Sequence, residues 1–65
     1  MANGIKQRRE ELHLTQKQVA EKAELRESQF QLYEYDKTLP SVATALRIAQ
    51  ALDTTVESLY KHLLK

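Results

Sequence analysis

The stretch TQKQVAEKAELRESQFQLYEY, residues 15–35, holds two short helical patterns separated by about three residues. Thr15 followed by Gln18 three residues later forms a capping box, which predicts that the first helix starts at Thr15. This helix is expected to end near residues 23–24. The apolar residues of its inward face recur at helical spacing: Val19, Ala20 and Ala23.

The second pattern of this stretch runs from Glu27 to Tyr35. At 3.6 residues per turn, one side of the helix gathers Phe30, Tyr33 and Glu34. The opposite side gathers more polar residues: Ser28, Gln31, Leu32 and Tyr35. Two short helices joined by a tight turn, the second with an outward polar stripe, are typical of a helix-turn-helix.

Three further helical blocks flank this pair. The first spans residues 3–13, with Asn3 as its expected N-cap. The fourth begins after Ser41, and its inward face is expected to hold Val42, Ala45, Leu46, Ala49 and Leu52. The fifth begins at Thr54 or Thr55, where Thr54 and Glu57 form a candidate capping box. We therefore predict an all-α fold of five helices in one domain, residues 1–65.

The composition excludes several classes of protein. The chain has 65 residues, of which 42% are apolar and none is cysteine, so disulfides and cysteine-ligated zinc are excluded. His13 and His62 lie far apart, with no acidic ligand set near them. No apolar run reaches the ~18 residues that span a membrane, and we expect a cytoplasmic protein. We expect no enzyme, metal or cofactor, because no nucleophile–base spacing or glycine-rich loop occurs.

From Ile5 to Tyr60 the chain resembles the lambda-repressor-like, Cro/XRE-type helix-turn-helix proteins. The landmarks match in spacing without a gap, and they are Leu14-Thr15-Gln16, Val19-Ala20, Ala23, Leu25, Phe30, Tyr33-Glu34, Pro40-Ser41, Leu46-x-Ile48-Ala49-x-Ala51-Leu52 and Leu59-Tyr60. The resemblance implies a sequence-specific regulator of transcription that binds double-stranded DNA as a homodimer. It favours repression over activation.

The resemblance also assigns roles to individual residues. The third helix would lie in the major groove, with base-facing residues Glu27, Ser28, Gln29, Gln31 and Leu32. Phosphate contacts would come from Gln16, Lys17, Arg26, Tyr35 and Lys37. The C-terminal helix is a candidate dimer interface through Leu59, Tyr60, Leu63 and Leu64, although packing against the domain's own core explains the same residues.

Arg9 lies on the apolar face of the first helix, four residues after Ile5. A buried charge without a partner is costly, so Arg9 requires one. In several family members an arginine at this position pairs with a glutamate of the third helix. The corresponding residue here is Glu34, and we expect a structural ion pair.

The sequence departs from the family pattern in the turn and on the recognition helix. Glu24 and Asp36 stand where glycine is common, and Arg26 stands where an N-cap serine or threonine is common. Glu27 brings a negative charge, which suits a cytosine amino group but is repelled by phosphate.

Residues 1–37 hold seven basic and seven acidic side chains, so their net charge is zero. Non-specific attraction to DNA is therefore expected to be weak. This leaves a second hypothesis open: a protein-binding module on the same fold, which pairs with another regulatory protein as an antirepressor or modulator.

Overall fold

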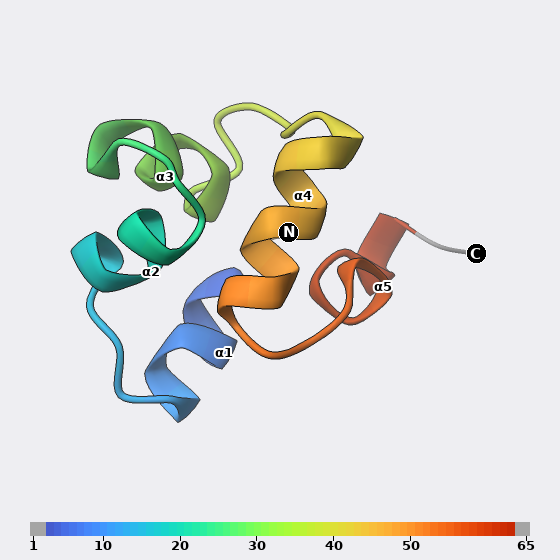
Figure 1. The fold of residues 1–65 in the computed structure, drawn as a ribbon. Coiled ribbons are helices and arrows are strands. Elements are labelled where there is room, and N and C mark those ends of the chain that lie inside the picture. The colour runs from blue at the N-terminus through green and yellow to red at the C-terminus, as the bar shows by residue number, and fades with distance from the viewer. Residues whose placement is uncertain (1–2, 64–65) are drawn as a thin grey trace.

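The computed structural model describes residues 3–63, and within this range every regular element is helical (Figure 1). The elements in chain order are α1 (Ile5–Glu11), α2 (Gln16–Lys22), α3 (Glu27–Glu34), α4 (Val42–Ala51) and α5 (Val56–Leu59), followed by a short 3₁₀ helix at Lys61–Leu63. The all-α, five-helix prediction is confirmed. In Figure 1, α2 and α3 lie together on one side of α4, and α5 lies on the other.

Side-chain caps start three of the helices. Thr15 and Gln18 form the expected capping box, with Thr15 Oγ1 accepting from Gln18 N–H at 3.1 Å and Gln18 Oε1 accepting from Thr15 N–H at 2.8 Å. Ser41 caps α4 as expected, through Thr44 N–H at 3.2 Å. Of the two predicted starts of α5, Thr55 is the cap and accepts from Ser58 N–H, so the candidate capping box of Thr54 with Glu57 does not start this helix.

Asn3 differs from its predicted role at the start of α1. The helix begins at Ile5 with Gly4 at the cap position, although Asn3 Oδ1 does accept from Ile5 N–H at 2.9 Å. The Asn3 side chain is buried, and its amide also donates to the Tyr33 carbonyl and to Asp36 Oδ1, both at 2.8 Å. Asn3 therefore fastens the start of α1 to the end of α3.

Each of the first four helices is followed, two residues after its last helical residue, by a residue with left-handed backbone geometry, and none of these residues is glycine. The φ angles are +57° at His13, +59° at Glu24, +58° at Asp36 and +53° at Asp53. The N–H of the following residue reaches back to the last helical turn each time, as in Leu25 N–H to the Ala20 carbonyl at 2.8 Å. This is the Schellman pattern of helix C-termini, in which the residue with left-handed geometry is normally glycine.

Replacing Glu24 by glycine is expected to stabilise the protein by roughly 1 kcal/mol. Left-handed geometry costs a residue with a Cβ about that amount, and glycine removes the cost. Glu24 is exposed, and within residues 3–63 its side chain makes no hydrogen bond or ion pair that its loss would break. Urea unfolding of wild type and E24G measures the change. Glu21→Gly, in the interior of α2, should destabilise by a similar amount, and a lower stability of E24G would contradict the argument.

All five helices contribute to one hydrophobic core. The fully buried large side chains are Ile5, Val19, Phe30, Ile48 and Leu52. Two residues predicted to face inward from α4 do not: Val42 is 78% exposed and Leu46 is 51% exposed. The helical spacing of α4 was correct, but only the part of its apolar face that includes Ala45, Ile48 and Ala49 is covered by other helices.

Tyr60 brings a hydroxyl into this core without a hydrogen-bond partner among residues 3–63. Burial, with smaller contributions from Asp36 and Tyr33, raises the pKa of Tyr60 to about 12. Because the folded state holds the proton more tightly than the unfolded state, stability falls as pH rises from about 10 to about 12.

The Tyr60→Phe variant is expected to be more stable than wild type by about 1 kcal/mol, because it removes a buried polar group that has no partner. Its stability should also decline less between pH 10 and pH 12. Chemical denaturation at pH 7 and across the alkaline range tests both statements. A destabilised Y60F would show that the hydroxyl has a partner in solution.

Candidate nucleic-acid interface

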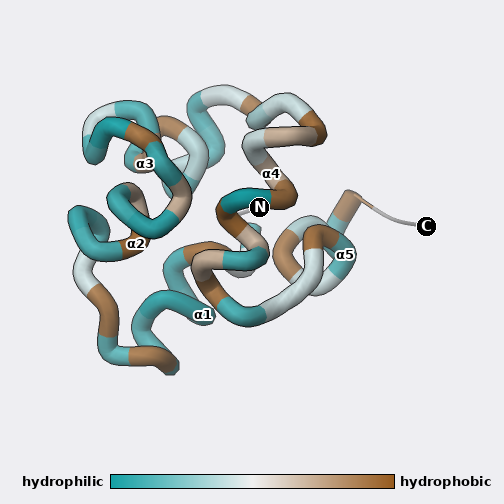
Figure 2. Tube along the Cα trace, viewed as in Figure 1, coloured by the Kyte–Doolittle hydropathy of each residue, from teal (hydrophilic) through white to brown (hydrophobic). Residues whose placement is uncertain are grey.

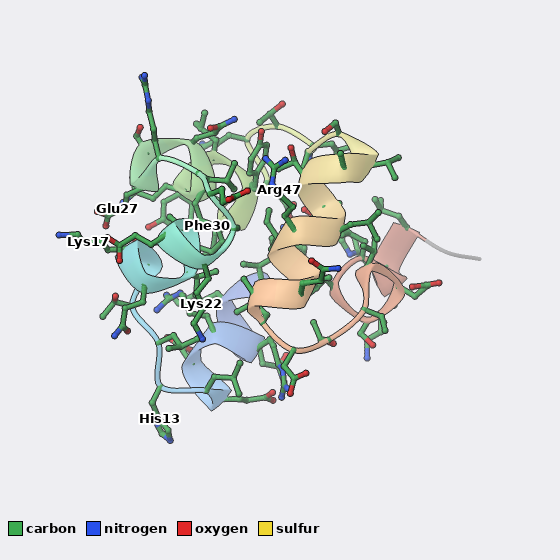
Figure 3. All side chains as sticks on the ribbon, viewed as in Figure 1. His13, Lys17, Lys22, Glu27, Phe30 and Arg47 are labelled. Carbon is green, nitrogen blue, oxygen red and sulfur yellow. The ribbon has the colours of Figure 1, made fainter. Side chains whose placement is uncertain are left out.

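The turn between α2 and α3 is held from both sides. Within the pair, Ala20 and Phe30 are buried and let the two helices pack closely. From outside, the Arg47 guanidinium of α4 donates from Nε to the Ala23 carbonyl at 3.0 Å, at the end of α2 (Figure 3). The sequence analysis did not predict this contact, because its acceptor is a backbone carbonyl, which no residue type marks in the sequence. The helix-turn-helix is therefore fixed to α4.

The outward face of α3 presents the residues that the sequence predicted to face bases. Exposed side chains are those of Glu27, Ser28, Gln29 and Leu32, whereas Gln31 is half-buried. Figure 3 shows Glu27 at the outer edge of α3, beside Lys17 of α2. Gln29 donates from Nε2 to the Tyr33 hydroxyl at 3.1 Å, so the buried Tyr33 has the edge partner that its hydroxyl requires.

Arg9 and Glu34 form the predicted ion pair at the inner side of α3. Arg9 Nε lies 2.9 Å from Glu34 Oε1, and Arg9 Nη2 lies 3.3 Å from Oε2. Arg9 Nη1 also donates to the Leu14 carbonyl at 2.9 Å. The Glu34 side chain is 1% exposed, and its hydrogen bond raises the pKa of the Arg9 guanidinium. The pair joins α1 to α3 and is structural.

Gln16, at the start of α2, connects this ion pair to the outer face of α3. Its Nε2 donates to Glu34 Oε2 and to the Tyr35 hydroxyl, both at 2.9 Å. Its Oε1 accepts from Gln31 Nε2 at 3.0 Å. The phosphate contact of Gln16 stays a prediction, and in this structure both N–H groups of its side-chain amide are donated within the protein. The sequence analysis singled out Gln16, Gln31, Glu34 and Tyr35 separately but did not predict that Gln16 hydrogen-bonds to the other three.

The predicted phosphate-binding cations surround the pair of helices without forming ion pairs. Lys17, Arg26 and Lys37 are exposed, and the two ion pairs among residues 3–63 are Arg8–Glu11 and Arg9–Glu34. Tyr35 is 54% exposed. The pair α2 and α3 thus carries positive charges that form no ion pair within residues 3–63, and Figure 2 shows that most residues of these two helices are hydrophilic.

The residues proposed for a dimer interface occupy different environments. Leu59 and Tyr60 are buried in the core, Leu63 is 53% exposed, and Leu64 lies outside the described residues. Leu63 borders an open apolar groove of about 490 Å³, which lies between α4, α5 and the loop that precedes α4. The groove is lined mainly by Leu39, Pro40, Val42, Leu46, Val56 and Leu63.

Within residues 3–63, no group of three or more histidine, cysteine or acidic side chains is arranged to hold a metal ion. None of the helices described in that range has the length and apolar character needed to cross a membrane.

Comparison with known proteins agrees with this geometry. No curated protein matches the sequence. A solved structure described as a complex of the SinR and SinI proteins superposes with a TM-score of 0.81 and 29% identity, covering 92% of this chain and 60% of that chain. This chain thus spans less than two thirds of the length of that neighbour. The helix-turn-helix family model matches residues 5–59. The chain therefore belongs to the Cro/C1-type helix-turn-helix family, whose members are DNA-binding regulators.

Proposed function

We propose that this protein is a sequence-specific transcriptional repressor that places α3 in the major groove of DNA. The observation that carries the proposal is the outward face of α3, where exposed polar side chains lie beside cations that form no ion pair within residues 3–63. Gln29 and Gln31 suit adenine, Glu27 suits the cytosine amino group, and Leu32 suits the thymine methyl group. Lys17, Arg26 and Lys37 would bind phosphates and set the register.

The charge balance favours binding as a homodimer. Residues 1–37 have a net charge of zero, so one copy has little sequence-independent affinity for DNA. Two copies on a palindromic site would double the number of base contacts, with half-sites about one helical turn, roughly 34 Å, apart. The apolar groove beside Leu39, Val42, Leu46 and Leu63 is the best candidate for the contact between copies, because it exposes four large apolar side chains.

Replacing Leu46 by glutamate is expected to abolish the dimer and to weaken binding to a palindromic site by at least about tenfold, because a charge in an apolar interface loses its hydration. Sedimentation equilibrium and the dependence of melting temperature on protein concentration report the dimer. Gln50→Glu on the exposed side of α4 is the matched control. If L46E and wild type have the same mass in solution and the same affinity, the groove is not the interface.

A second candidate function is a protein-binding module that modulates another regulator. It is favoured by the exposed Leu32 and Tyr35 and by the neutral charge of the first three helices. The similar solved structure is described as a complex between two proteins. In this role the same surface of α3 would contact protein instead of base edges.

Selection from a randomised DNA duplex pool, followed by a salt titration of the bound sequences, tests the proposed function. Enrichment of a palindromic site, bound with a measurable salt slope, would support the dimeric DNA-binding regulator. Absence of any enriched sequence would overturn it in favour of the protein-binding module. Repression is then tested with the enriched site placed in a promoter that drives a reporter gene.

A further inference from the structure

The hydrogen bonds between Glu34, Gln16 and Gln31 run in one direction, and the charge of Glu34 sets that direction. A carboxylate can only accept hydrogen bonds, so the Gln16 group facing Glu34 Oε2 at 2.9 Å must be the amide nitrogen. The oxygen of Gln16 therefore points the other way. There it lies 3.0 Å from the Gln31 side chain, which must present its own nitrogen.

Glu34 has no freedom to reverse this order. Its side chain is 1% exposed, and both of its oxygens are held by Arg9, at 2.9 and 3.3 Å. Gln16 is equally constrained, because its second N–H is donated to the Tyr35 hydroxyl at 2.9 Å. Exchanging the nitrogen and oxygen of Gln16 would place the amide oxygen against the Glu34 carboxylate with no hydrogen atom between them, which is unfavourable in a partly buried site.

The consequence is a fixed pattern on the half-buried Gln31. One of its N–H bonds is directed to Gln16, and within residues 3–63 its oxygen and its other N–H have no hydrogen-bond partner. An adjacent acceptor and donor on one amide is the pattern that binds adenine through N6 and N7 in the major groove. A glutamine free to flip would lose part of its selectivity, because it would present either order of donor and acceptor.

We propose that Gln31 is the main adenine-specifying residue and that Gln16 and Glu34 are positioning residues, which orient its amide from the buried ion pair. This inference rests on the proposed DNA-binding function. It gives Gln16 a role different from a simple phosphate contact. It also separates Gln31 from Gln29, whose amide bonds to the Tyr33 hydroxyl, a group that can either donate or accept and so sets no direction.

The experiment measures discrimination instead of affinity alone. The selected DNA site is synthesised with adenine, 7-deazaadenine or purine at each adenine position, and wild-type affinity is measured by fluorescence anisotropy. The first analogue removes the N7 acceptor and the second removes the N6 amino group. At one position per half-site, both analogues should weaken binding by about 10- to 100-fold, and the Gln31→Ala variant should no longer distinguish them from adenine.

Gln16→Met tests the positioning role, because methionine keeps the length of the side chain without its hydrogen bonds. We expect Q16M to reduce the preference for adenine at the Gln31 position by at least fivefold, with the salt slope of binding unchanged. Exposed Gln50→Met on α4 is the control and should keep the full preference. Melting temperatures verify that both variants fold, and the base-analogue measurement on wild type does not depend on any variant.

Three results would overturn the inference while leaving the proposed function intact. Q16M could keep the full adenine preference, Q31A could keep the response to both analogues, or the base that depends on Gln31 could be other than adenine. If wild type selects no DNA sequence, the proposed function fails and this inference fails with it.

Discussion

Replacing Arg9 by methionine is expected to destabilise the protein by about 3–5 kcal/mol. The substitution keeps most of the apolar side chain but leaves the Glu34 carboxylate buried at 1% exposure without its cation. The total stability of a domain of this size is about 3–10 kcal/mol. R9M should therefore lose at least about a third of the total stability, and urea denaturation and thermal melting monitored by circular dichroism measure that loss.

The double variant Arg9→Met with Glu34→Leu distinguishes a buried unpaired charge from lost packing. Replacing both partners by apolar residues is expected to recover most of the stability that R9M loses, because no buried charge remains. The exposed side of the Arg8–Glu11 pair provides the matched control: Glu11→Gln removes that ion pair but leaves the hydrogen bonds of Arg8 to the Leu52 and Asp53 carbonyls in place, and it should cost much less stability. An R9M variant as stable as wild type would mean that Glu34 reaches water or another donor in solution.

Replacing Gln29 and Gln31 together by alanine is expected to abolish sequence-specific DNA binding. Each glutamine–adenine contact contributes about 1–3 kcal/mol to the choice of base, so the pair is worth about 30-fold or more in affinity for the selected site. The cost in stability should be about 1 kcal/mol, because each side chain makes one hydrogen bond at the surface of α3 and alanine favours the helix. Anisotropy titrations and thermal melts measure the two effects separately.

The control for this variant is binding to DNA of unrelated sequence at low salt, which should remain unchanged because neither glutamine is charged. Gln50 is exposed on α4, so Gln50→Ala is the corresponding substitution away from α3 and should leave binding to the selected site unchanged. If Q29A/Q31A binds the selected site as well as wild type does, α3 does not read the bases and the assignment of the recognition helix is wrong.

Much of the fold follows from local patterns. The capping signals of Thr15 with Gln18 and of Ser41 depend on residues three positions apart, so the sequence alone indicates these helix starts. The need of Arg9 for a partner was also predictable from its place on an apolar helix face, and the family resemblance named Glu34 as that partner. At α5 adjacent threonines offered two caps, and the tertiary structure selected Thr55.

The apolar groove proposed as the contact between copies could not be predicted from the sequence. Helical spacing identifies an apolar face on α4 but not how much of it the other helices cover, so the exposure of Val42 and Leu46 appears only in the folded protein.

The sequence by itself determined the helices, the helix-turn-helix and the need of Arg9 for a buried partner, because these follow from local propensity and from the cost of unpaired charge. Only the tertiary structure decided that Gln16 bridges Glu34 and Gln31. Hydrogen bonds between side chains of α2 and α3 require donor and acceptor atoms about 3 Å apart, and the packing of the two helices sets that distance.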